Sequence, residues 1–177
     1  MTATDALRAD HEVIERALRV MERAALRLEA GETLSPEILS SAVDFLRNFA
    51  DGCHHAKEEL ALFPRLVERG LIRDGGPIGV MLHEHDLGRA YIRRLEDALD
   101  RDDRESTVDA IHCYTALLRN HILKENEVLF PMADRLLTPD DQTDLLAAFE
   151  RLERERIGAS VIERYGALLA HIERAVR

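Results

Sequence analysis

The spacing of apolar residues and of helix breaks constrains the fold of this chain more than any other feature. Apolar residues recur every three to four positions along most of its 177 residues, which is the period of an α-helix with one buried face. Glycine and proline are scarce, with nine and five residues, and they gather where this period is interrupted. The sequence therefore predicts long helices joined by short connections, and its strand signals are weak.

The expected helices begin and end at recognisable signals. Ser35-Pro36 joins an N-cap residue to a first-turn proline, and Thr138 with Asp141 has the form of a capping box. Gly31 follows the first periodic stretch as a stop signal. The expected helices cover residues 5–30, 35–64 with a last piece to 70, 77–100, and 106–130 with a kink past Pro131, and Gly158 divides two further helices after residue 138.

We expect an all-α protein. Residues 1–137 should form an up-down-up-down four-helix bundle, because four helices of about 25 residues with short connections favour that arrangement. Residues 138–177 should form a helical extension packed on the same domain. An apolar stripe in this extension either caps the core or forms the surface of a homodimer, and it consists of Leu145, Leu146, Phe149 and Leu152.

Composition excludes several classes of function. The formal net charge is −10, which argues against nucleic acid and against anionic membrane surfaces as partners. No apolar run has the length of a membrane span, and the first residues do not resemble a signal peptide. Two cysteines do not make a disulfide framework, so we expect a cytoplasmic protein with reduced thiols.

One eleven-residue frame occurs twice. HHAKEELALFP covers residues 54–64 and HILKENEVLFP covers residues 121–131, with six of eleven positions identical. In each copy a histidine and a glutamate lie four residues apart, so they share one face of a helix: His54 with Glu58, and His121 with Glu125. Both pairs lie on the apolar side of their helix, where a carboxylate is costly unless it is paired or bound to a metal.

The other two long helices each add one inward histidine, His11 and His85, on their apolar stripes. Four imidazoles and two carboxylates suit a site for two metal ions. Nitrogen and oxygen ligands favour iron or manganese, and zinc and copper accept them too. The predicted metal ligands are His11, His54, Glu58, His85, His121 and Glu125.

Each piece of this pattern also has a simpler interpretation. A single inward histidine is usually a hydrogen-bonded core residue, and a single His-x-x-x-Glu pair is usually solvated. The combination of the repeated frame with two further inward histidines favours a metal site. His55 remains an alternative to His54, because it lies four residues before Glu59, although the aligned Leu-Phe-Pro endings favour His54. The minor candidates are His83 and Glu84 as further ligands, and Tyr114 as a hydrogen-bond donor to a bound molecule.

The chain has two lysines, Lys57 and Lys124, and they occupy matched positions of the two frames. Lys57 has no acidic residue three or four positions away, so an ordinary pair on the helix surface does not explain it. Either the lysines contact a carboxylate of the metal site or control access to it, or they remain from shared descent of the two halves.

These residues resemble the hemerythrin-like HHE cation-binding domains. The resemblance rests on the six predicted ligands in their order along the chain and on the two Leu-Phe-Pro endings, and it spans roughly residues 5–137. It implies a four-helix bundle with a non-haem di-iron centre that the two glutamates bridge. The oxygen-carrying members have five histidines, with two on the third helix, whereas Met81 and Arg89 occupy the positions four residues from His85 here. We therefore expect one iron with fewer nitrogen ligands and an open position for a small molecule.

Three functions are compatible with these features. The first is a di-iron protein that binds, senses or reduces a small oxidant, namely oxygen, nitric oxide or peroxide, with or without enzymatic turnover. The second is an iron sensor or store. The third is a helical interaction module without a metal.

Overall fold

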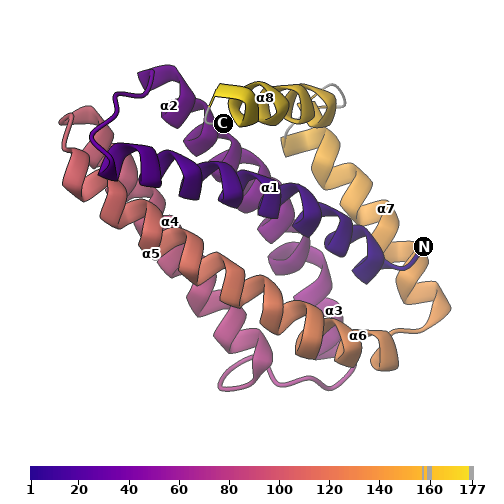
Figure 1. Cartoon of the computed structure of the whole chain (residues 1–177). Helices are drawn as coiled ribbons and strands as arrows, with labels where there is room; N and C mark the ends of the chain where they lie inside the picture. Colours follow the sequence, from indigo (N-terminus) through magenta and orange to yellow (C-terminus); the bar gives the residue numbers. More distant parts are fainter. Residues whose placement is uncertain (157, 159–160, 176–177) are drawn as a thin grey trace.

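The computed structural model describes residues 1–156, 158 and 161–175, and within these residues it contains helices and no strand. The helices shown in Figure 1 are, in chain order, α1 (Ala3–Glu29), α2 (Pro36–Phe45), η1 (Leu46–His55), η2 (Glu58–Leu62), α3 (Phe63–Glu68), α4 (Pro77–Asp100), α5 (Arg104–Lys124), η3 (Glu125–Leu129), α6 (Phe130–Leu136), α7 (Pro139–Arg156) and α8 (Val161–Ala175). The three η segments are π-helical, with hydrogen bonds that span five residues instead of four.

Four long rods form a bundle. The first is α1, the second runs without interruption from α2 to α3, the third is α4, and the fourth runs from α5 to α6. The rods α1, α2–α3, α4 and α5–α6 pack side by side, and α7 and α8 lie against them on one side (Figure 1). The predicted all-α bundle with additional C-terminal helices is confirmed.

Local signals act at the ends of the helices as the sequence predicts. After α1, Gly31 has a φ of 83°, a left-handed conformation that side chains disfavour. Before α7, the Thr138 hydroxyl accepts the Asp141 N–H while the Asp141 carboxylate accepts the Thr138 N–H, which is a complete capping box. Asp141 also pairs with Arg65 and Arg69 at the end of the second rod, so the start of α7 is held to the bundle.

The repeated Leu-Phe-Pro ending follows a widened turn in both copies. The Phe63 N–H donates to the Glu58 carbonyl oxygen, and the Phe130 N–H donates to the Glu125 carbonyl oxygen. Pro64 comes next and lacks an N–H, and its ring would crowd the carbonyl of an ordinary α-helical turn. The π-helical turn provides the extra room, and each rod therefore continues past its proline.

Two clusters of buried apolar side chains fill the bundle. One is centred on residues such as Leu18, Phe45 and Ile111, and the other contains Leu62 and Phe130. The residues of the predicted metal site belong to neither cluster. They form a buried polar layer within the apolar interior.

The C-terminal extension packs on the bundle. In α7, Leu145 and Phe149 are each 3% exposed and belong to the second apolar cluster. In α8, Tyr165 and Leu169 belong to the first apolar cluster, which also contains Leu18 and Phe45. The sequence predicts that the apolar stripe of residues 145–152 either caps the core or forms a dimer surface. Leu145 and Phe149 cap the core. The division into a bundle over 1–137 and an extension over 138–177 stays a prediction, which these contacts support.

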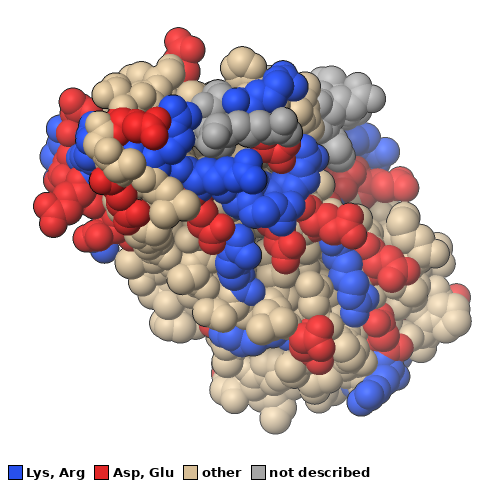
Figure 2. All heavy atoms as spheres, in the orientation of Figure 1, with Lys and Arg blue, Asp and Glu red and all other residues tan. Residues whose placement is uncertain are grey.

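The surface carries charges of both signs. Figure 2 shows acidic and basic side chains mixed over the face in view. None of the helices in the described part of the chain has both the length and the apolar character that a membrane crossing requires.

Candidate metal centre

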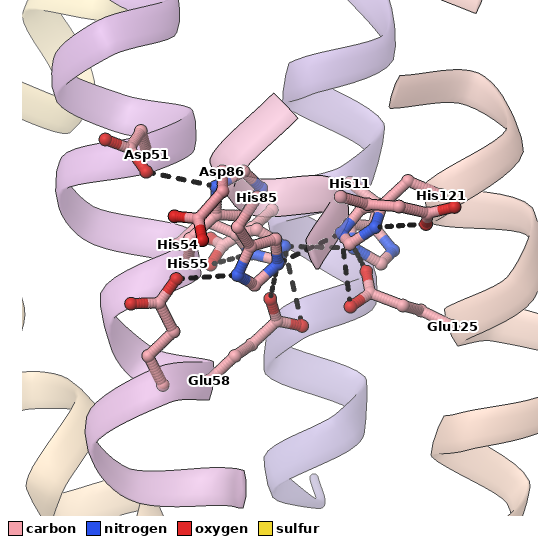
Figure 3. Close-up of polar contacts among 12 residues, drawn as sticks. His11, Asp51, His54, His55, Glu58, His85, Asp86, His121 and Glu125 are labelled. Carbon is pink, nitrogen blue, oxygen red and sulfur yellow. Dashed lines mark hydrogen bonds and ion pairs between the residues drawn. The ribbon is translucent and has the colours of Figure 1, made fainter. Parts of the chain in front are cut away.

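The structure brings all six predicted residues together in the middle of the bundle. Their side chains come from four different rods and point toward one another (Figure 3). None is more than 2% exposed: His11, His54, Glu58, His85, His121 and Glu125. The periodicity argument therefore selected residues that do converge.

A seventh residue, His55, lies in the same cluster. Two groups of potential ligand atoms result, in which all atoms lie within 4.8 Å of one another. Group 1 consists of His11, His54, Glu58 and Glu125, and group 2 consists of His55, Glu58, His85 and His121. Glu58 belongs to both groups.

The structure brings a fifth imidazole, His55, to the four predicted ones. Sequence reasoning treated His55 as a replacement for His54, since consecutive residues of an α-helix point in different directions. The segment that carries both residues, η1, is π-helical, and its wider turn lets neighbouring histidines both face inward. The rings of His54 and His55 are 1% and 3% exposed, with centroids 5.6 Å apart.

The Nδ1 atoms of all five histidines point away from the centre to an oxygen atom of another side chain. The acceptors are Asn126 for His11 (3.0 Å), Asp10 for His54 (3.3 Å), Asp51 for His55 (3.3 Å), Glu59 for His85 (2.7 Å) and Glu84 for His121 (3.1 Å). Four of these oxygens belong to carboxylates and the fifth is the amide oxygen of Asn126, and both kinds accept hydrogen bonds. Each Nδ1 therefore carries the proton and each Nε2 carries a lone pair. This is the arrangement in which outer carboxylates orient metal-binding imidazoles.

The Nε2 lone pairs face one another at short range. His11 Nε2 is 3.0 Å from His54 Nε2, and His85 Nε2 is 3.2 Å from His121 Nε2. Two lone pairs at this distance repel unless a proton or a cation lies between or beside them. Since the imidazole protons are on Nδ1, a proton held by a neighbouring glutamate relieves this repulsion in the metal-free protein, and a bound metal cation would relieve it in the loaded protein.

The two glutamates also indicate a metal site. All four carboxylate oxygens of Glu58 and Glu125 are buried without a hydrogen-bond partner among the described residues, and so is His55 Nε2. Each glutamate approaches one histidine of each group. Glu125 oxygens are 3.1 Å from His11 Nε2 and 3.3 Å from His121 Nε2. Glu58 oxygens are 3.8 Å from His54 Nε2 and 3.4 Å from His85 Nε2. Unpaired buried carboxylates are costly, so this set of atoms fits metal ions.

Burial also sets the protonation of the site. Loss of solvation lowers the pKa of His55 to about 3 and of His121 to about 4, which keeps these imidazoles neutral and able to donate a lone pair to a metal. Burial raises the pKa of Glu125 to about 8 and, together with the nearby Glu125 charge, raises the pKa of Glu58. The metal-free carboxyls therefore tend to hold protons, which a bound metal displaces.

The centre has an approximate internal two-fold relation. Phe63 of the first frame stacks on His85, with ring centroids 6.0 Å apart, and Phe130 of the second frame stacks on His11 at 5.4 Å. In each frame, the residue after the glutamate accepts a hydrogen bond from a histidine of another rod. Glu59 accepts it from His85, and Asn126 accepts it from His11. The repeated sequence therefore specifies a repeated set of contacts around the metal site.

The two lysines follow the same relation. Lys57 binds Asp10, the acceptor for His54, with Nζ 2.7 Å from Oδ2. Lys124 binds Glu84, the acceptor for His121. Each lysine thus holds the carboxylate that orients the histidine of its own frame, which agrees with the interpretation that they contact carboxylates of the site. They differ in one respect: Lys57 is 2% exposed and also binds Glu153 of α7 at 2.6 Å, whereas Lys124 is 41% exposed.

The minor candidates have other places. Glu84 orients His121 through Nδ1 and belongs to neither ligand group. His83 is exposed on α4. Tyr114 is buried on α5, two turns before His121, and also belongs to neither group. No signal in the sequence paired Asp10 or Asn126 with a histidine, because these contacts join different rods. Asp51 and His55 lie four residues apart on the second rod, and this spacing could have paired them.

Comparison with known proteins agrees with this geometry. An uncharacterized protein of Mycobacterium tuberculosis is 24% identical over 182 residues, covering 99% of this chain and 71% of its own length. The iron-sulfur cluster repair protein YtfE of Edwardsiella ictaluri is 37% identical over 125 residues, covering 66% of this chain and 56% of its own length. The YtfE of Musicola paradisiaca is 36% identical over 93 residues, which is 46% of this chain and 40% of that protein.

No solved structure matches this chain. The family model of the hemerythrin HHE cation-binding domain matches residues 2–133, which include both frames and all seven converging residues. On this match and on the cluster of buried histidines and glutamates, the chain belongs to the hemerythrin HHE cation-binding domain family.

Proposed function

We propose that this protein holds two iron ions between its four rods and uses them to bind a small oxidant, namely oxygen, nitric oxide or peroxide. The observation that carries the proposal is the pair of ligand groups that share Glu58, with Glu125 of group 1 also lying 3.3 Å from His121 of group 2. Manganese and zinc accept the same ligands, and the YtfE likeness favours iron.

The two groups differ in nitrogen content. Group 1 has two imidazoles, and group 2 has three. An ion in group 1 would therefore keep more of its coordination sphere for a small molecule, and we propose the open position there. This argument replaces the one from the sequence, which counted four histidines, because the structure brings a fifth to the site. Bound iron would supply the bond to that molecule and, where reduction follows, the electrons.

The protein's own residues would do the rest. Glu58 and Glu125 would bridge the two ions, and the five Nδ1 hydrogen bonds would hold the imidazoles in place. The stacked Phe63 and Phe130 rings cover His85 and His11 and exclude water from that end of the site. A dry, pre-formed site of this kind binds a small ligand without rearrangement of the bundle.

Repair of iron–sulfur centres is a second candidate, and the likeness to YtfE favours it. The chain matches 56% of the length of that relative, so the relative's whole activity is not carried over with the domain. The candidate predicts that the iron-loaded protein restores activity to an enzyme whose iron–sulfur cluster has been damaged by oxidant, and that the metal-free protein does not.

Metal content tests the principal proposal. Protein loaded anaerobically with iron(II) and desalted should hold about two irons per chain. Glu58→Ala and Glu125→Ala should abolish stable binding of the pair, whereas Glu127→Ala, an exposed residue next to the site, should leave it intact. Full iron occupancy in both inward variants would overturn the assignment. Repeated consumption of peroxide per site would then identify a catalyst, and a change in stability or partner on loading without turnover would identify a sensor.

A further inference from the structure

A cavity of about 160 Å³ opens beside the metal centre between the second rod, α4 and α5. This volume holds about five water molecules at roughly 30 Å³ each. Its inner wall contains the His55 ring and its partner Asp51 from η1, the Gly88 backbone with Arg89 and Ile92 from α4, and Tyr114 from α5. The cavity therefore reaches a residue of group 2 from the outer side of the bundle.

Hydrogen-bond donors dominate the inner wall. Tyr114 is 3% exposed, and its hydroxyl has no hydrogen-bond partner within the part of the chain that the structure describes. The Arg89 guanidinium has five N–H groups, and three of its bonds go to Asp51 (2.8 Å), Asp86 (3.1 Å) and Glu59 (2.6 Å). The two carboxylates of the cavity lining are already occupied, Asp51 by Arg89 and by His55 Nδ1, and Glu96 by Arg47. A molecule in the cavity would thus meet donors that lack acceptors.

The cavity breaks the internal two-fold relation. Asp51 lies three residues before His54, and His55 lies one residue after it. Gly88 lies three residues after His85. The corresponding positions around His121 and His11 carry buried apolar side chains that fill the first apolar cluster: Leu118, Ile122 and Ile14. On one half of the centre the core is closed, and on the other half a smaller residue and polar residues replace apolar ones at the matched positions.

The glycine makes the opening. A Cβ at Gly88 would lie 3.9 Å from a Tyr114 ring carbon and 4.0 Å from a Leu117 methyl, which is ordinary van der Waals contact. Alanine therefore fits at this position. A larger side chain would enter the space between Gly88 and Tyr114, where the cavity lies.

We propose that this cavity binds a small molecule rich in hydrogen-bond acceptors, of the size of a peroxide or a nitrite ion, and holds it beside His55 before it enters the metal centre. Tyr114 and Arg89 donate the hydrogen bonds. The step into the centre rests on the proposed function, whereas binding in the cavity needs only the residues of its wall.

Binding is tested first on the metal-free full-length protein, with nitrite as the probe. Sodium nitrite should shift the backbone amide NMR signals of Gly88, Arg89 and Ile92, and sodium chloride at the same ionic strength should not. Tyr114→Phe should weaken nitrite binding at least tenfold, because a hydrogen bond to a charged group contributes about 1.5–3 kcal/mol. The matched control is Tyr91→Phe, on α4 outside the cavity wall. Shifts that are absent, or that Tyr114→Phe leaves unchanged, would overturn the proposal.

Entry is tested on the iron-loaded protein with azide, whose binding to iron is followed by absorbance. Gly88→Leu should slow azide binding without lowering the iron content, and Gly88→Ala should bind azide at the wild-type rate. Equal rates in the two variants would overturn the role of the cavity in entry. The two tests distinguish this inference from the proposed function. Protein that binds nitrite in the cavity but does not hold iron would refute the proposed function alone. Protein that holds two irons but shows no nitrite binding in the cavity would refute this inference alone.

Discussion

Replacement of the two lysines by methionine should have very different effects, although the lysines occupy matched positions. Methionine keeps the length and the apolar stem of lysine and removes the charge. Lys57 is 2% exposed and binds both Asp10 and Glu153, whereas Lys124 is 41% exposed and binds Glu84.

The magnitude follows from burial. Removing one partner of a buried ion pair leaves an uncompensated charge and costs about 3–5 kcal/mol. Asp10 is 15% exposed and Glu153 is 31% exposed, so water relieves part of this cost at Glu153 and we take the lower end, about 3 kcal/mol. In the Lys124–Glu84 pair Glu84 is 11% exposed but Lys124 is 41% exposed, so water reaches the pair through the lysine and we take the upper end of the range for exposed pairs, about 1 kcal/mol.

Thermal unfolding of the metal-free protein measures the difference. For a chain of this size 1 kcal/mol shifts Tm by about 2–4 °C, so Lys57→Met should lower Tm by about 6–12 °C and Lys124→Met by less than about 4 °C. The metal is removed by a chelator beforehand, because a bound ligand would add its own stabilisation. Equal losses in the two variants, or a larger loss at Lys124, would refute the argument that burial and the contact with α7 distinguish the matched lysines.

Two further predictions concern the C-terminal extension. Its contact with the bundle through Asp141 depends on pH. The hydrogen bonds from Arg69, Thr138 and Arg65 hold the pKa of the Asp141 carboxyl below its ordinary value of 3.8. The contribution of this carboxylate to the stability of the folded protein is therefore complete above pH 3.8 and is lost as the pH falls below it. Asp141→Asn should therefore lower Tm at pH 7, with a gap from wild type that narrows below pH 3.8, and a gap that widens in acid would contradict this. Tyr165→Ala should cost about 3–5 kcal/mol, as for other buried aromatic side chains, and should keep a single unfolding transition if α8 and the bundle unfold together; circular dichroism with two separate transitions would show that they do not.

Several parts of the site could be read from the sequence because they depend on one helix at a time. The four-residue spacing of His54 and Glu58, and of His121 and Glu125, places each pair on one face whatever the helix packs against. The apolar stripes around His11 and His85 show in the same way which side of each helix faces inward. Local periodicity therefore selected six of the seven converging residues.

From the sequence, His55 is only an alternative to His54, for a local reason that the sequence does not display. Its inward position requires the π-helical turn of η1, and the residue pattern of that segment also fits an ordinary α-helix. The repeat was itself misleading here, because alignment of the two frames places Ile122 opposite His55 and so favours one histidine per frame.

The sequence by itself determined that this chain forms long helices, where they begin and end, and that histidines and glutamates lie on their apolar faces, because helical period and capping are properties of neighbouring residues. Tertiary structure decided which carboxylate orients each imidazole, that α7 buries Lys57 while Lys124 stays at the surface, and that a cavity opens at Gly88 on one half of the site only. Apart from Asp51 with His55, these contacts join residues far apart in the sequence, such as Glu59 with His85, 26 positions apart, and Lys57 with Glu153, 96 positions apart. Their distances depend on how the rods pack against one another, and that packing is a property of the whole bundle that no single helix encodes.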